Sequence, residues 1–466
     1  QAAASRPSPP VPSSSIQVVA AARTAGREED AAPPKTTFGD VFGVAEFRAL
    51  WLAQLVSVTG DQLARVALTI LVYDRTRSSA LAAVTFAASV LPTFIGGLAL
   101  SGLADRLPRR RVMIAANLTS GALIALMVLP GVSLVGAIML LFAVTMIGAA
   151  FTSARAAIYP DILDGDRYVL GTAVTQTTNG FAQVLGFAVG GVAVGFLGVR
   201  TSLVADAATF GASALLIRAR VHARPASRPL ATSPLPAPEP PAARAAPRRG
   251  RHRRPGPLAE AASGVRLVVT SPAMRTPLLF GLLSAFYNVP DGLATPLARA
   301  VGGGAVTVGA IFASQALGQT VGAIGFSRLV TPAQRVRWTA PLAVAASTAL
   351  AAMATGPGLP GIVVILACSG LFSCYQLAAN ASFVQATPPA RRSQAFGIAN
   401  GSLSLGQSVT IIIAGVAAAH VSAADVVAAT GSLGVLCTLA IALTKAARAC
   451  WPIRPGPGEI PPDPAT

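Results

Sequence analysis

The chain has 466 residues, of which 53% are hydrophobic and only 12% are charged. Ordinary soluble domains carry about 25% charged residues, so this composition excludes an ordinary soluble globular protein. The formal net charge of +18 would suit a nucleic-acid-binding protein, but the arginines are concentrated in short segments beside apolar stretches. That distribution is typical of membrane topology, and it predicts a polytopic α-helical membrane protein that does not bind nucleic acid.

The chain begins with a polar segment and continues with repeated apolar windows. Residues 1–45 mix Ala, Pro, Ser and charged residues, which predicts a disordered cytoplasmic tail without a cleaved signal peptide. A helix needs about 20 mainly apolar residues to cross the hydrocarbon core, and such windows recur about twelve times. The predicted spans lie near residues 49–73, 79–103, 112–130, 133–153, 168–197, 201–217, 274–298, 305–327, 338–355, 361–384, 395–419 and 425–446.

A basic segment divides these spans into six and six. Between residues 219 and 258 the apolar pattern stops, and Pro and Arg dominate. Either this segment is solvated and its arginines fix topology, or it contacts anionic lipid headgroups; its proline content favours the first alternative. The predicted domains are a six-helix bundle at 46–218, a cytoplasmic linker at 219–265, a second six-helix bundle at 266–447 and a cytoplasmic tail at 448–466.

The arginines also predict the orientation. With the N-terminus inside, the cytoplasmic segments hold most of the basic residues. The predicted outer loops keep only Arg75, Arg77, Arg200 and Arg299. This asymmetry satisfies the positive-inside rule along the whole chain. We therefore expect a multi-pass protein of the plasma membrane with both termini in the cytoplasm.

The first predicted span carries a polar stripe. Its members lie on one helical face, because their spacing follows the helical period: Gln54, Ser57, Asp61, Arg65 and Thr69. Charges at the middle of a membrane are costly, so this face needs a cavity or a polar partner. Asp61 and Arg65 are one turn apart, close enough to pair. Either they neutralise each other and orient the helix, or Asp61 exchanges a proton while Arg65 binds an anionic part of a substrate.

Other spans carry further polar side chains. A single amide commonly bridges packed membrane helices, whereas the combined number here favours a lined cavity. The substrate-cavity candidates are Gln54, Gln62, Gln176, Gln183, Asn288, Gln315, Gln319, Gln376 and Asn380. Asp291 follows Pro290, which removes a backbone donor and can break the helix, so it is the second proton-coupling candidate. Asp206 lies near the outer end of its span, and we expect it to snorkel to the interface.

The loop between the second and third spans reads SGLADRLPRR from Ser101. This loop resembles the signature of the major facilitator superfamily, although Pro108 stands where the signature has glycine. The resemblance covers roughly residues 45–447 and implies two six-helix bundles with a substrate site between them. It also implies a cytoplasmic gate, for which the candidates are Gly102, Asp105, Arg106, Arg109 and Arg110. In this reading Asp105 pairs with charges of the opposite half; the alternative is simple charge balance.

A finer resemblance concerns the subgroup. The segments FRALWLAQLVSVTGDQLARVALTILVYDRT and FTSARAAIYPDIL resemble the exporters of enterobactin and macrolides. GFAVGG from Gly186 is similar to a motif of exporters in the fifth span, with Phe187 in place of its proline. Gly186, Gly190 and Gly191 predict close helix packing, with a role in gating as a second expectation.

These observations together predict a secondary transporter rather than an enzyme. We expect proton-coupled efflux of a small amphipathic molecule, such as a drug, a siderophore or a secondary metabolite, by a transporter that works as a monomer. The alternatives are an importer on the same fold and a membrane receptor or scaffold that does not transport. The three histidines are scattered, and the four cysteines lack the spacing of a metal site or a disulfide framework. We therefore predict no catalytic residue, metal or cofactor.

Overall fold

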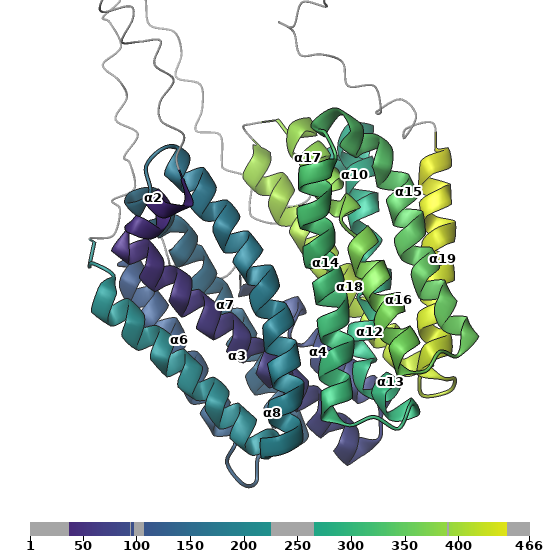
Figure 1. The fold of residues 1–466 in the computed structure, drawn as a ribbon, viewed down its shortest axis with the longest axis horizontal. Helices are drawn as coiled ribbons and strands as arrows, with labels where there is room; N and C mark the ends of the chain where they lie inside the picture. The colour runs from purple at the N-terminus through teal and green to yellow at the C-terminus, as the bar shows by residue number, and fades with distance from the viewer. Residues whose placement is uncertain (1–36, 94, 97–106, 225–264, 389–390, 445–466) are drawn as a thin grey trace, which may run out of the picture.

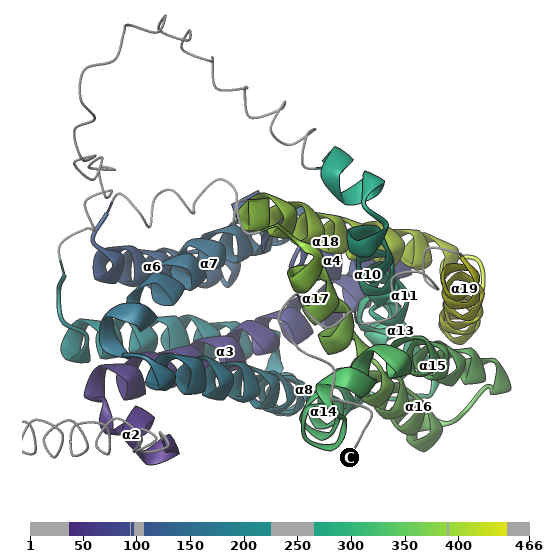
Figure 2. The same ribbon diagram turned by 90° about the horizontal axis from the view of Figure 1, so that it is seen from above.

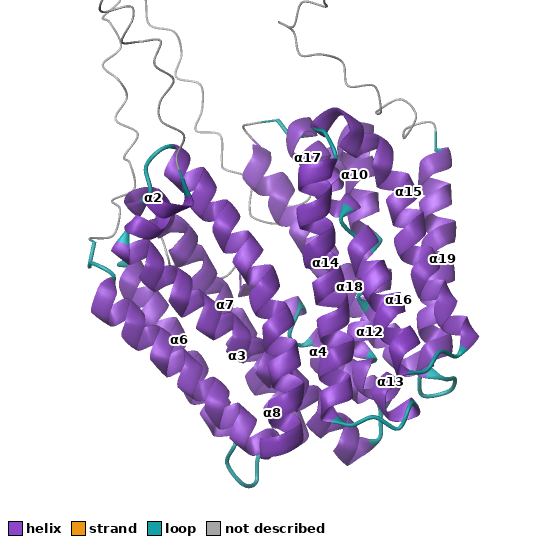
Figure 3. Ribbon diagram, viewed as in Figure 1, coloured by secondary structure: helices purple, strands orange, loops and turns teal. Residues whose placement is uncertain are grey.

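The computed structural model describes residues 37–93, 95–96, 107–224, 265–388 and 391–444. Regular structure in these ranges is helical, without any strand (Figure 3). The predicted C-terminal tail, residues 1–36 of the predicted N-terminal tail and most of the basic linker lie outside the described residues. The end of the predicted disordered tail is helical instead, with a helix at Phe38–Gly43. The prediction of an all-α polytopic membrane protein is confirmed.

The N-terminal bundle starts with a short helix and continues with long ones. Its helices are α2 (Phe38–Gly43), α3 (Ala45–Thr76), α4 (Ser79–Ala87), α6 (Arg109–Met127), α7 (Leu134–Ile162) and α8 (Asp166–Arg220). With 55 residues, α8 would be about 80 Å long if it were straight, far more than a bilayer is thick. Gly198, at φ 79°, breaks the helical geometry and divides α8 into the fifth and sixth predicted spans.

The C-terminal bundle contains shorter, interrupted helices. They are α10 (Pro272–Leu282), α11 (Ser284–Tyr287), α12 (Val289–Gly292), α13 (Ala294–Ala300), α14 (Ala305–Leu329), α15 (Pro332–Ala351), η1 (Ala352–Thr355), α16 (Leu359–Phe372), α17 (Tyr375–Ala386), α18 (Arg392–Ala417) and α19 (Ala423–Leu443). The seventh predicted span, 274–298, is therefore four short helices. Pro290 lies in the first turn of α12, where a missing backbone donor is tolerated and where the preceding helix ends.

Several helices begin at a side-chain cap. Ser78, Ser133 and Ser422 precede α4, α7 and α19, and each hydroxyl accepts a hydrogen bond from a backbone N–H in the first turn. Such caps satisfy donors that the helix leaves unpaired. The caps at Ser133 and Ser422 follow turns at residues 127–134 and 417–423, where the sequence predicted breaks between spans.

Each predicted apolar window coincides with a helix or a group of helices. For the second window, 79–103, this is seen only in its first part, because residues 97–106 lie outside the described ranges. By length and apolar character alone, seven helices of the described residues can cross a membrane. One of these, Asp166–Arg220, contains two predicted spans. Other spans fall short of that criterion because they are divided, as with α10 to α13, or carry several polar residues.

The helices form two bundles that meet along two helix pairs. In the N-terminal bundle α8 packs on α3 and α6, and in the C-terminal bundle α14 packs on α16 and α15 on α19. The bundles contact each other mainly through α8 with α14 and α4 with α18 (Figures 1 and 2). In Figure 1 they lie together at the lower end and diverge toward the upper end, where α2 and α17 lie. We call the lower end, where α13 lies, the closed end.

The predicted packing glycines lie at two contacts of α8. A Cβ on Gly190 would lie 3.1 Å from the Cα of Leu63 on α3. Gly186 faces the same helix, with the carbonyl oxygen of Thr59 2.9 Å from its ideal Cβ position. Gly191 instead faces α14, where a Cβ would lie 2.7 Å from the Cα of Gly309. Gly191 thus brings the backbones of the two bundles together.

Gly191→Ala is expected to weaken this contact between the bundles. Its methyl group would meet backbone atoms, which cannot turn away, so α8 and α14 must separate at a cost of about 1–3 kcal/mol. We expect a lower melting temperature and more labelling of the interface from the closed end. Gly211→Ala on the same helix is the control, because a Cβ there meets no atom within 4 Å. Equal melting temperatures for the two variants would contradict the prediction.

Candidate functional site

Two cavities meet at the stripe of α3. The N-terminal cavity has a volume of about 270 Å³ and is enclosed by α3, α6, α7 and α8. Its polar lining includes Gln54, Ser57, Asp61, Gln62, Arg65, Asn117, Ser120, Asn179, Gln183 and Asp206. The predicted polar face of the first span therefore lines a cavity and does not face lipid.

The interface cavity has a volume of about 150 Å³ and lies between the bundles. Its polar lining consists of Arg65, Gln183, Asn288, Asp291, Gln315, Gln319 and Gln407. Phe187 and Phe312 form part of its apolar wall, and their rings stack with centroids 4.8 Å apart. Arg65 and Gln183 line both cavities, so they stand where the two spaces adjoin.

The guanidinium of Arg65 is held by neutral acceptors. Its Nη1 donates to Gln62 Oε1 at 3.3 Å, and its Nη2 donates to the carbonyl oxygen of Ser89 at 3.4 Å. An ion pair with Asp61, one of the two alternatives for these residues, is not formed: no carboxylate of the described residues lies within 4.0 Å of Arg65. Asp61 from the N-terminal bundle and Asp291 from the C-terminal bundle nevertheless both interact with it electrostatically.

Asp206 differs from its sequence-based interpretation. Its side chain does not reach the outer interface but is fully buried, with 0% exposure, and lines the N-terminal cavity. Thr209 Oγ1 donates to the backbone carbonyl of Asp206 at 2.7 Å and lies 3.3 Å from Asp206 Oδ1. Asp206 Oδ2 has no hydrogen-bond partner. The prediction of snorkelling was wrong because α8 turns this residue toward α3.

Some candidate amides lie away from the two cavities. Gln376 and Asn380 line a separate C-terminal cavity of about 280 Å³ between α10, α17 and α18. Gln176 is exposed and accepts a hydrogen bond of 3.5 Å from Asn179. The structure therefore groups six of the nine candidates around Arg65: Gln54, Gln62, Gln183, Asn288, Gln315 and Gln319.

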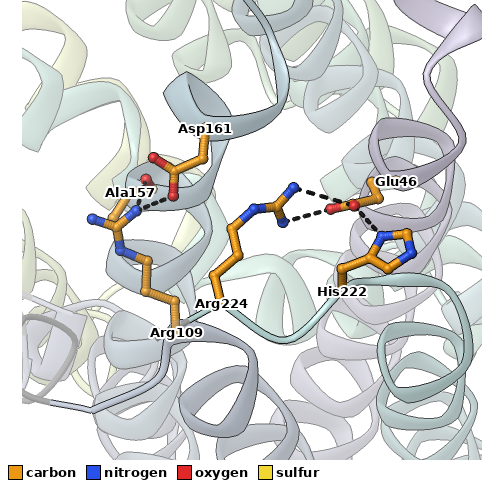
Figure 4. A network of polar contacts seen from close by, with 6 residues as sticks. All are labelled: Glu46, Arg109, Ala157, Asp161, His222 and Arg224. Carbon is orange, nitrogen blue, oxygen red and sulfur yellow. Dashed lines mark hydrogen bonds and ion pairs between the residues drawn. The ribbon is translucent and has the colours of Figure 1, made fainter. Parts of the chain in front are cut away.

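The candidate gating motif is described only in part. Gly102, Asp105 and Arg106 lie outside the described residues. Arg109 donates to Asp161 at 2.5 Å and to the carbonyl oxygen of Ala157 at 2.6 Å (Figure 4). Arg110 donates to the carbonyl oxygen of Arg218 at 2.6 Å. These contacts tie α6 to α7 and α8 within the N-terminal bundle.

A second polar network ties the beginning of the linker to α3. Arg224 donates to both carboxylate oxygens of Glu46, at 2.7 and 3.2 Å, and His222 also bonds to Glu46 (Figure 4). The hydrogen bond to Glu46 raises the pKa of Arg224. The network fixes the chain that leaves α8 beside the first turn of α3.

Arg224→Gln is expected to lower the stability of the N-terminal bundle modestly. The pair is partly exposed, so its loss should cost about 1 kcal/mol, or roughly 2–4 °C in melting temperature. Thermal denaturation in detergent measures this change. Arg220→Gln removes an exposed arginine four residues earlier and is the control. A melting temperature that falls no more than in the control would contradict the prediction.

The closed end carries an ion pair between the bundles. Arg299 Nη2 donates to both carboxylate oxygens of Asp74, at 2.7 and 2.8 Å. It joins the C-terminal end of α3 to that of α13, and among the described residues it is the one ion pair that crosses between the halves. Sequence reasoning treated Arg299 as a topology signal only. The opposite charges of Asp74 and Arg299, at the outer ends of the first and seventh predicted spans, could have indicated this pair.

The sequence profile described as Major Facilitator Superfamily matches residues 50–291, just over half of the chain. The chain belongs to the major facilitator superfamily. It is a multi-pass membrane transporter of the secondary type, and its substrate class is a small molecule. No curated protein sequence matches it significantly. The resemblance to the enterobactin and macrolide exporters therefore stays a prediction.

Solved structures share the fold at low sequence identity. A POT family transporter in complex with a thioalcohol-conjugated peptide has a TM-score of 0.66 at 10% identity, covering 85% of this chain and 95% of that one. The nucleoside transporter NupG gives 0.65 at 14% identity, with 85% and 98% covered. A bacterial homologue of the human lysosomal transporter Spinster, in an inward-facing conformation, gives 0.60 at 15%, with 87% and 95% covered.

Proposed function

We propose that this transporter exports a medium-sized amphipathic solute in exchange for protons, by alternating access. The observation that carries the proposal is the place of Arg65, which lines both cavities and interacts with one carboxylate from each bundle. One guanidinium carries a single positive charge and cannot neutralise both half-buried carboxylates at once. A proton on Asp61 or Asp291 removes the attraction of that carboxylate for Arg65, so Arg65 is drawn toward the carboxylate of the other bundle. Protonation is thereby linked to the contact between the two bundles.

The cavity walls favour an amphipathic substrate. The lining of the interface cavity alternates amides with aromatic and aliphatic groups, among them Phe86, Phe187 and Ile411. A sugar would require denser hydrogen bonding than these separated amides offer. The two adjoining cavities have about the volume of a drug-sized ligand. The peptide conjugate and nucleoside named for the structural neighbours are of comparable size.

The conformation supports alternating access with the closed end on the outside. If both termini are cytoplasmic, as the arginines predict, the Asp74–Arg299 pair closes the extracellular side and the bundles diverge toward the cytoplasm. The chain would then be in an inward-facing state, ready to receive a cytoplasmic solute. The two polar cavities along the charged face of α3 favour a transporter over a scaffold that does not transport.

The decisive test is transport by the full chain in proteoliposomes. A panel of lipophilic cations, zwitterions and siderophore-like anions is offered with and without a pH gradient, and flux is measured in both directions. We expect gradient-driven flux in the export direction, and we expect Asp61→Asn to abolish the effect of the gradient. Asp164→Asn, the same change on an exposed loop of the same bundle, should leave it intact. Unaltered coupling in Asp61→Asn, or flux in the import direction only, would overturn the proposal.

A further inference from the structure

A second carboxylate, that of Asp206, lines the N-terminal cavity together with Asp61. Asp206 lies eight residues beyond the break at Gly198, about 12 Å along the sixth span. It packs against the middle of α3, where Gly60 leaves room for it: a Cβ at Gly60 would overlap both Asp206 Oδ1 and Thr209 Oγ1. Asp61 is the next residue of α3, and the two carboxylates interact electrostatically.

The position of Asp206 calls for a positive partner. Its side chain is fully buried, it lines the cavity, and its Oδ2 atom has no hydrogen-bond partner. A buried carboxylate without a partner is strongly destabilising unless it takes up a proton or a cation. The only protein donor within hydrogen-bond distance of its carboxylate among the described residues is the hydroxyl of Thr209. The unpartnered oxygen therefore marks a position for a cation in the N-terminal cavity.

The charges around the cavity do not balance. Its ionisable lining residues are Asp61, Arg65 and Asp206, whereas the lining residues from α6 and α7 are uncharged. Arg65 also interacts with Asp291 across the interface cavity. Three carboxylates thus line the two cavities beside one guanidinium, so the charges balance only if two more positive charges are present. One of these belongs beside Asp206, because it is the fully buried carboxylate and one of its oxygens has no hydrogen-bond partner.

We propose that Asp61 and Asp206 together form a binding site for one monovalent cation, H⁺ or Na⁺, inside the N-terminal bundle. A bound proton forms an O–H bond on one of the two carboxyl groups; a sodium ion is coordinated by carboxylate oxygens and by hydroxyls of the same cavity lining, such as that of Ser57. The site deepens the proposed function, because it supplies the coupling cation. Its second carboxylate, Asp206, lies away from the interface cavity, whereas Asp61 shares the N-terminal cavity with Arg65.

Infrared spectroscopy of the purified full chain tests the proton without any substrate. The protein should show the C=O stretch of a protonated carboxyl group, and its intensity should change between acidic and alkaline buffer. Asp206→Asn, which conserves size, should lose this band, and Asp61→Asn should shift or remove it. Asp164→Asn is the matched control and should retain it. A band that survives unchanged in both Asp206→Asn and Asp61→Asn, together with no sodium response, overturns the site.

Sodium is tested by thermal stability in NaCl against choline chloride. A rise in melting temperature with NaCl that disappears in Asp206→Asn identifies Na⁺ as the occupant, whereas no rise together with the infrared band identifies H⁺. Gly60→Ala, which fills the space beside Asp206, should reduce either signal if the chain folds. Neither measurement uses a substrate, so the two proposals fail separately. Absence of flux in the wild-type chain would overturn the proposed function. An infrared band and a NaCl effect that are the same in Asp206→Asn as in the wild type would overturn the cation site alone.

Discussion

Arg65→Gln is expected to lower gradient-driven flux by about tenfold or more. The substitution removes the one cation that lines both cavities beside the half-buried carboxylates of Asp61 and Asp291. Hydrogen bonds of a charged group contribute about 1.5–3 kcal/mol, and about 1.4 kcal/mol corresponds to a factor of ten. Arg65→Lys keeps the charge but lacks the planar fork whose two terminal nitrogens bond separately to Gln62 and Ser89, so we expect partial flux only.

Two comparisons make this result interpretable. Arg75→Gln removes an exposed arginine from the same helix and should transport normally. The double variant Arg65→Gln with Asp291→Asn removes a cation together with one of its anions, so it should recover thermal stability without recovering coupling. Arg65→Gln with near wild-type coupled flux would refute the central role that we give this residue.

Arg299→Glu is expected to open the closed end. The substitution replaces the bidentate ion pair with Asp74 by two like charges. A partly exposed pair contributes about 1 kcal/mol, and repulsion of similar size adds to its loss, so the balance between conformations should shift by roughly tenfold or more. The readout is labelling of a cysteine at position 288 in the interface cavity, after the native cysteines are replaced, with reagents added from each side.

Charge reversal provides the control for this experiment. Exchanging the two charges, as Asp74→Arg with Arg299→Asp, should restore the original labelling pattern. Arg200→Glu changes an exposed arginine of a predicted outer loop and should have no effect. If Arg299→Glu labels like the wild type, the ion pair contributes nothing to closure of this end.

The polar stripe of α3 illustrates how far the sequence reached. Its helical spacing placed Gln54, Asp61 and Arg65 on one face, and that face does line a cavity. Spacing along one helix could not show which partner each side chain meets, because partners come from other helices. Of the two alternatives for Asp61 and Arg65, the structure shows no ion pair, because Arg65 donates to Gln62 and Ser89 instead.

By itself, the sequence determined the membrane environment, the six-plus-six order of the spans, the break before Pro290 and the family signature. These properties follow from local hydrophobicity, charge and backbone chemistry, which are properties of short segments. Only the tertiary structure decided that Asp206 is buried beside Gly60, that Asp74 meets Arg299, and that Gln376 and Asn380 lie in a cavity of their own. Those facts depend on how distant helices pack and turn, which hydropathy does not encode.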